Sequence, residues 1–207
     1  IVSIVTAASA KNIFLSGNYA KFRRYVWQHS LVTAIIGKII CEKMQWKEAA
    51  EEVFIGGLLH DIGKVILNQI DRKLYIDVMN TTLDSGKAFR HAEKESFGVE
   101  SPVVGQLILK IWNLPVIYRE VTVFLDKPSD PAMQRLPVHD QQIVRIVGLA
   151  NLLAKMNEFG HLEADHAALE SEYLQPLGIT PDGALMSIDW KKAVVNDTYY
   201  QVFSVIG

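Results

Sequence analysis

Apolar residues recur at helical spacing along nearly the whole chain. In the segment 19–45, Val26, Ile35 and Ile39 fall on one side of a helix, and the segment 47–60 has a similar apolar side. No alternating run that would predict a strand stands out, and no repeat of fixed period is found. The pattern therefore predicts an all-α fold, a multi-helix bundle.

Turn-forming residues divide this pattern into segments. The predicted helices span 1–15, 19–45, 47–60, 64–67, 71–83, 101–112, 115–125 and 138–159, followed by two short helices and a final one. The stretch 87–97 is short and polar, and 126–137, which holds three prolines, is the clearest loop. We expect Ser101 to be an N-cap, because Pro102 follows it at the first helical position.

Composition narrows the class of protein. The 207 residues fit one large domain or two small ones, and 49% of them are hydrophobic. A net charge of −2 does not favour non-specific binding of nucleic acid. No window of the sequence reaches the roughly 18 apolar residues that a membrane span needs. The single cysteine, Cys41, excludes an intrachain disulfide and favours a reducing compartment. We expect a cytoplasmic protein with Cys41 buried in a helix.

An imidazole and a carboxylate stand side by side in the segment 56–64, which reads Gly-Gly-Leu-Leu-His-Asp-Ile-Gly-Lys. Neighbours on a helix point about 100° apart, so His60 and Asp61 can converge on one point only where the helix ends. Gly63 is the predicted end of that helix. A His-Asp pair at a helix end, beneath an apolar run, is a sensible beginning for a divalent metal site.

Two further residues could complete this site. His29 lies in the predicted helix 19–45, about 30 residues before the pair, which ends the predicted helix 47–60. If these two helices are antiparallel and joined by a short turn, His29 would lie close to the pair. Asn151 is the only polar residue in an apolar stretch, so it must face a polar group or lose about 1–3 kcal/mol as a buried amide. A site of His29, His60, Asp61 and Asn151 carries a single negative charge and would hold a divalent cation weakly.

The residues around the pair have their own interpretations. Lys64 could contact the oxygens of a phosphate, or it could begin a new helix in solvent, and both interpretations stay open. Gly56 and Gly57 each cost about 1 kcal/mol in a helix relative to alanine, which predicts close approach of a neighbouring helix.

The other histidines give weaker signals. His91 lies in a charged stretch and is expected in solvent, whereas His139 begins a helix that Asp140 is expected to cap. His161 and His166 fall in a polar turn. The sequence contains no phosphate-binding loop, serine-hydrolase elbow or paired-cysteine metal site.

Four motifs taken together resemble the HDOD family, the HD-related output domain of bacterial signalling proteins and a relative of the HD-GYP cyclic-dinucleotide phosphodiesterases. The motifs are Trp27-Gln28-His29-Ser30-Leu31, Phe54-Ile55-Gly56-Gly57-Leu58-Leu59-His60-Asp61-Ile62-Gly63-Lys64, Phe97-Gly98 and Trp112-Asn113-Leu114-Pro115. The resemblance covers about residue 1 to at least residue 155. It implies an HD-domain-like helical bundle over 1–207, lacking the N-terminal helices that the family usually has.

The resemblance also implies a metal site that has lost some of its usual ligands. His29, His60 and Asp61 stand at positions that hold metal in HD phosphohydrolases. Where HD-GYP-like sites have further ligands, this chain has Ser101, Leu125-Asp126 and Asn151. A binuclear site is therefore expected to be lost, while a mononuclear site would keep three of its four usual ligands.

Three hypotheses follow for function. The first is a signal-transduction output or regulatory module with a degenerate site, which acts by binding a partner protein, an attached domain or a small ligand such as a nucleotide. The second is a metal-dependent phosphohydrolase acting on a nucleotide or cyclic dinucleotide, with Lys64 as a phosphate contact. The third is structural: His29 and His60 would each donate to Asp61 and tie helices together.

Overall fold

The computed structural model describes residues 9–11, 20–159 and 169–204, and these form an all-α bundle with no strand among them. The predicted fold class is confirmed. The elements are α2 (Ala20–Lys43), η1 (Lys47–Ala49), α3 (Ala50–Leu59), α4 (Ile62–Ile70), α5 (Arg72–Ser85), α6 (Phe89–Phe97), α7 (Ser101–Ile111), α8 (Val116–Phe124), η2 (Met133–Arg135), α9 (Val138–Met156), η3 (Leu169–Leu174), η4 (Gln175–Leu177), α11 (Trp190–Val195) and α12 (Thr198–Phe203). Of the predicted first helix, residues 9–11 are described and are helical, and His161 and His166 lie outside the described residues.

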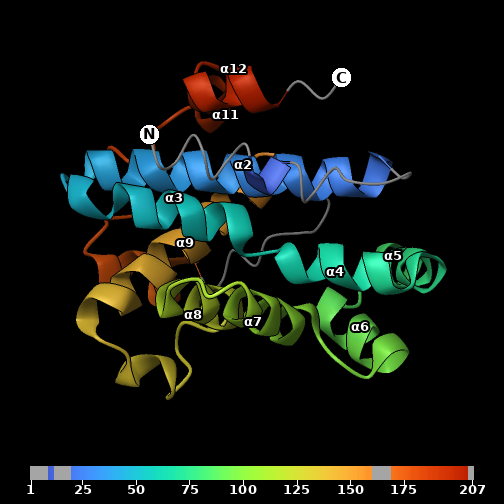
Figure 1. The fold of residues 1–207 in the computed structure, drawn as a ribbon. Coiled ribbons are helices and arrows are strands. Elements are labelled where there is room, and N and C mark those ends of the chain that lie inside the picture. Colours follow the sequence, from blue (N-terminus) through green and yellow to red (C-terminus); the bar gives the residue numbers. More distant parts are fainter. Residues whose placement is uncertain (1–8, 12–19, 160–168, 205–207) are drawn as a thin grey trace.

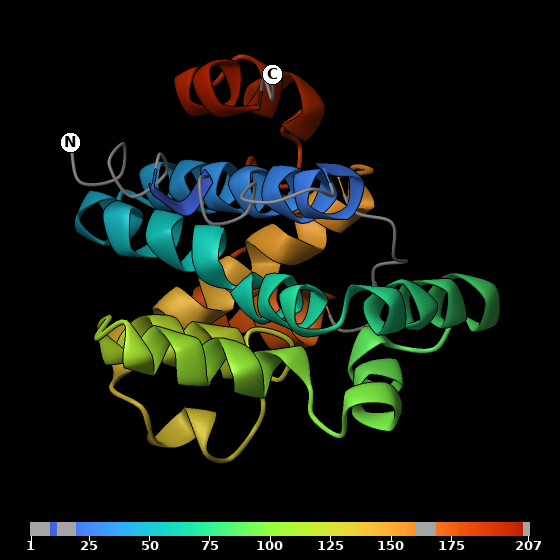
Figure 2. The ribbon, with the colours of Figure 1, turned by 45° about the vertical axis from the view of Figure 1, so that its right-hand side comes forward.

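Helix α2 lies at the centre of the bundle (Figure 1). Its side chains Trp27, Leu31 and Ile35 are fully buried, and α3 and α9 pack along it. Helices α11 and α12 lie against α2 on the side away from α7 and α8, as Figures 1 and 2 show. Helix α7 packs against both α4 and α8, and α8 also contacts α3.

Close helix packing explains one of the paired glycines. A Cβ atom on Gly57 would lie 2.7 Å from the Cα of Ala34 in α2, so only glycine lets α3 approach α2 this closely. The prediction of close approach is confirmed there. At Gly56 a Cβ would meet Val121 and Val147 at 3.4 Å and 3.5 Å, which is ordinary contact.

The break in the His-Asp segment falls two residues earlier than predicted. Helix α3 ends at Leu59, His60 and Asp61 form a turn, and Gly63 lies inside α4. A Cβ on Gly63 would lie 1.9 Å from the carbonyl oxygen of Ser101, so this glycine serves the crossing of α4 with α7. The turn, and not Gly63, is what turns two adjacent side chains toward one point.

Two predicted caps are wrong. Glu100 holds the N-cap position of α7, and Ser101 is the first helical residue. Pro137 precedes α9, and no side chain caps it; Asp140 lies in its first turn, where a negative charge still favours the helix N-terminus. The polar stretch 87–97 largely forms α6.

Other expectations about burial are confirmed. Cys41 is buried in α2, and His91 is exposed. The expectation that no window is apolar enough for a membrane span is wrong by length and composition, because Lys47–Ile70 reaches that threshold. However, 72% of its most apolar window is buried inside the protein, as in a core helix.

Candidate functional site

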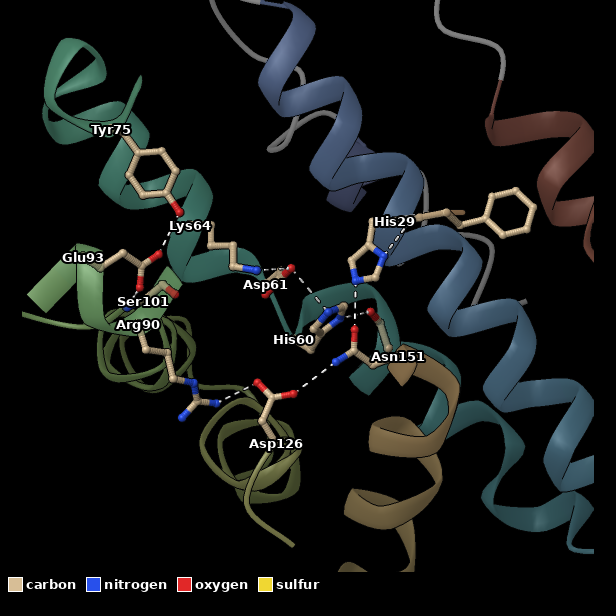
Figure 3. A network of polar contacts seen from close by, with 12 residues as sticks. His29, His60, Asp61, Lys64, Tyr75, Arg90, Glu93, Ser101, Asp126 and Asn151 are labelled. Carbon is tan, nitrogen blue, oxygen red and sulfur yellow. Dashed lines mark hydrogen bonds and ion pairs between the residues drawn. The ribbon is translucent and has the colours of Figure 1, made fainter. Parts of the chain in front are cut away.

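The turn between α3 and α4 brings His60 and Asp61 together. The backbone of Asp61 leaves the helical region, with φ −103° and ψ 13°, so its carboxylate swings toward the preceding imidazole. His60 Nε2 lies 3.5 Å from Asp61 Oδ2 (Figure 3). His60 Nδ1 lies 2.7 Å from the carbonyl oxygen of Gly57, which fixes the ring and directs Nε2 into the cluster.

His29 enters the same cluster from α2. It is buried, and its ring centroid lies 5.3 Å from that of His60. Its Nδ1 lies 2.8 Å from the carbonyl oxygen of Phe159. One ligand atom each from His29, His60 and Asp61 falls within 4.8 Å of the others, so the fold brings these three predicted residues together.

Asn151 faces polar groups, as predicted for a lone amide in an apolar stretch, and these groups are His29 and Asp126. Its Oδ1 lies 2.9 Å from His29 Nε2, and its Nδ2 donates to Asp126 Oδ1 at 3.2 Å. Asn151 is buried on α9, so both partners satisfy an amide that would otherwise be costly. The amide of Asn151 therefore connects the histidines to a carboxylate that sequence reasoning counted only as a departure from the family pattern.

The His29 ring is uncharged at neutral pH. Burial, followed by the neighbouring His60, lowers the pKa of His29 to about 3. A neutral ring has one N–H, yet both of its nitrogens face carbonyl oxygens, those of Phe159 and Asn151. A neutral His29 ring can therefore donate to only one of these two oxygens.

Lys64 lies inside the cluster and not in solvent. Its Nζ donates to Asp61 Oδ2 at 2.8 Å, and its side chain is 20% exposed. Burial alone would raise the pKa of Asp61, but Lys64 and His60 outweigh it and hold that pKa well below its usual range. The ion pair in turn raises the pKa of Lys64 against the effect of burial. The carboxylate that a metal would need is thus already bound to an ammonium group.

A cavity of about 100 Å³ adjoins this ion pair. Its charged lining residues are Asp61, Lys64, Arg90, Asp126 and Lys155. Arg90 donates to Asp126 Oδ2 at 3.0 Å, so the second carboxylate also has a cationic partner. Sequence reasoning missed Arg90 and Lys155; for Lys155 a signal existed, because it follows Asn151 by one turn on the same face of α9.

Ser101 lies at the cavity wall, where it offers a hydroxyl and no imidazole. Its backbone N–H donates to Glu93 Oε2 at 2.7 Å, and Tyr75 donates its hydroxyl to Glu93 Oε1 at 2.7 Å. Glu93 is fully buried and joins α5, α6 and α7 beneath the cavity. This network is structural, and it fixes the wall of the site.

Among the described residues, His29, His60 and Asp61 offer donors for one divalent ion. His60 Nε2 is buried without a hydrogen-bond partner among the described residues and faces the same point as His29 Nε2 and Asp61, which suits a mononuclear site. Leu125 has no donor atom in its buried side chain, and Ser101 offers only a hydroxyl. Asp126 is directed to Arg90 and Asn151. The third hypothesis is only partly matched, since His29 contacts Asn151 and Phe159 in place of Asp61.

Comparisons with known proteins agree with this fold. A family model for the HDOD domain matches residues 1–128, more than half of the chain. An HDOD domain protein of unknown function from Geobacter sulfurreducens superposes with a TM-score of 0.71 at 23% identity, covering 98% of this chain and 67% of that one. A protein from Shewanella amazonensis, named as a candidate phosphohydrolase, superposes with a TM-score of 0.62 at 17% identity, covering 91% of this chain and 64% of that one. The chain thus spans about two thirds of each neighbour. No curated protein matches it.

Proposed function

The chain belongs to the HDOD family, and on this premise we propose that it is a regulatory module of bacterial signal transduction that does not hydrolyse a substrate. It acts in the cytoplasm by binding a partner protein, an attached domain or a small ligand. The cluster of His29, His60 and Asp61 is the site at which a ligand or partner would act on the module.

One observation supports this proposal: Lys64 Nζ donates a hydrogen bond to Asp61 Oδ2 at 2.8 Å, so this oxygen already has a cationic partner. A divalent cation would have to displace this ammonium group, or bind beside it against like-charge repulsion. The opposite side of the cluster offers Asn151, which brings no charge. Weak metal binding removes the means to make hydroxide from water at neutral pH, which a bound divalent ion would supply.

Metal analysis and activity together test the proposal. Protein purified without a His tag or a chelating column is expected to contain much less than one transition metal ion per chain. A panel of nucleotides and cyclic dinucleotides with Mg²⁺, Mn²⁺, Fe²⁺ or Ni²⁺ should show no turnover. About one tightly held metal per chain, together with phosphodiesterase activity, would overturn it.

A metal-dependent phosphohydrolase acting on a nucleotide or cyclic dinucleotide is the second candidate. It is favoured by the grouping of His29, His60 and Asp61 within 4.8 Å and by His60 Nε2, which has no hydrogen bond among the described residues. In this case His60→Ala and Asp61→Ala would abolish turnover while the helical content measured by circular dichroism stays the same. Absence of turnover across the panel above would rule this candidate out.

A further inference from the structure

Three cationic side chains from three different helices surround the cavity beside Asp61. Lys64 comes from α4, Arg90 from α6 and Lys155 from α9, and Figure 3 shows Arg90 beside Asp126 and Lys64 beside Asp61. The lining has two carboxylates, so it carries one cation more than it has anions.

Lys155 is the cation without a partner. It is half-buried and forms no hydrogen bond or ion pair with another residue that the structure describes. Its charge lies in the same cavity lining as Asp126 and Arg90. A partly buried ammonium that contacts no carboxylate directly can bind an anion beside it.

Arg90 keeps donors to spare. Its guanidinium uses Nη2 on Asp126, whose side chain is 45% exposed, while the Arg90 side chain is 19% exposed. A guanidinium has five N–H donors in a planar fork, which suits the paired oxygens of a phosphate. Asp126 holds the fork at the cavity wall and competes with an incoming anion for it.

The size of the cavity limits what enters it. One water needs about 10–15 Å³ and pockets that enclose a whole ligand start at about 300 Å³, whereas this cavity has about 100 Å³. It has room for a phosphate group but not for the rest of a nucleotide. Phe89 is half-buried and lines both this cavity and a smaller one beside it, next to Tyr25, so an aromatic surface adjoins the cations.

We propose that this cavity binds the phosphate group of a phosphate monoester or diester, held by Arg90 and Lys155 with no metal ion. The inference rests on the proposed function, because it supplies the small ligand of a module that binds without hydrolysis. Lys64 stays on Asp61 and completes the positive wall.

The test uses the whole chain in EDTA and follows amide signals by NMR while probes are added at constant ionic strength. AMP and adenosine form a matched pair that differs only by the phosphate group. Inorganic phosphate tests whether free phosphate binds, and cyclic di-GMP tests whether a phosphate diester binds. AMP or cyclic di-GMP is expected to shift signals around the cavity, whereas adenosine leaves them unchanged.

Variants identify the residues. Arg90→Gln and Lys155→Gln should each weaken phosphate-ligand binding by about tenfold or more, the effect of one charge-assisted contact. Lys94→Gln is the control, because Lys94 is an exposed cation one turn further along α6. Asp126→Asn should tighten binding by freeing Arg90, a gain that a folding defect cannot imitate.

The inference is overturned if no phosphate-bearing probe binds, if adenosine binds as well as AMP, or if Lys94→Gln weakens binding as much as Arg90→Gln. These failures leave a module regulated by a protein partner intact. Conversely, turnover of the same probes after addition of metal would overturn the proposed function while leaving the phosphate subsite in place.

Discussion

Lys64 Nζ donates to Asp61 Oδ2 at 2.8 Å, so this carboxylate oxygen already has a cationic partner. The two residues lie three apart across the start of α4, so the turn that exposes the carboxylate also delivers the ammonium to it. The ion pair therefore follows from local geometry, and it sets the charge that any ligand meets.

Removing Lys64 should strengthen metal binding. In Lys64→Met the carboxylate of Asp61 loses its internal cation, so affinity for Mn²⁺ or Ni²⁺ should rise by about tenfold or more, given the size of one charge interaction at this distance. Isothermal titration calorimetry measures the change. Lys73→Met removes an exposed lysine from α5 and should have no effect. Equal metal affinity in all three proteins would show that Lys64 does not limit the site.

His29 should make the fold sensitive to acid. Its pKa is about 3 in the folded protein and near 6.5 in the unfolded chain, so below pH 6.5 only the unfolded chain takes up this proton. The free energy of unfolding should then fall by about 1.4 kcal/mol per pH unit between pH 6 and pH 4 from this group. Asp61 adds its own loss at lower pH, since its folded pKa is also lowered.

Urea denaturation at several pH values in EDTA measures this slope. His29→Gln should flatten it, whereas His91→Gln, which changes an exposed histidine, should leave it unchanged. The same slope in His29→Gln and the parent protein would contradict the explanation.

Gly63 should tolerate no side chain. A Cβ there would lie 1.9 Å from the Ser101 carbonyl oxygen and 2.8 Å from the Gly105 nitrogen, and both are backbone atoms that cannot move aside cheaply. Gly63→Ala is expected to destabilise the fold by about 3 kcal/mol or more, measured by urea denaturation. Gly56→Ala is the control: its Cβ would meet valine methyls at 3.4 Å or beyond, so the change should be small. Comparable losses in both variants would contradict the assigned role of the α4–α7 crossing.

Glu93 should matter for stability although it lies in a polar segment of the sequence. Its carboxylate accepts from the Tyr75 hydroxyl and the Ser101 N–H, both at 2.7 Å. Glu93→Gln should lower the free energy of unfolding by about 1.5–3 kcal/mol, because both charge-assisted bonds weaken. Thermal or urea unfolding tests this, with Glu95→Gln, at an exposed position on the same helix, expected within about 0.5 kcal/mol of the parent. Equal effects of the two changes would show that the hydrogen bonds of Glu93 do not stabilise the fold.

Helical periodicity predicted most of the secondary structure, because the buried face of an amphipathic helix appears in the sequence as apolar residues at helical spacing. The segment 71–83 became α5, with Asp71 as its N-cap and Gly86 in the left-handed conformation after it. The break near His60 was placed two residues late, since a glycine can serve either a helix end or a close crossing and the sequence does not distinguish them.

The sequence by itself determined the helices, the family resemblance, and which residues were candidates: His29, His60, Asp61, Lys64 and Asn151. Only the tertiary structure decided that Asp126, Arg90 and Lys155 share their site, and that Lys64 is bound to Asp61. The physical reason is that charge pairing depends on distances between side chains from different helices, and those distances are set by crossings such as the one at Gly63. A helical pattern records which face is buried, but not which charge lies opposite.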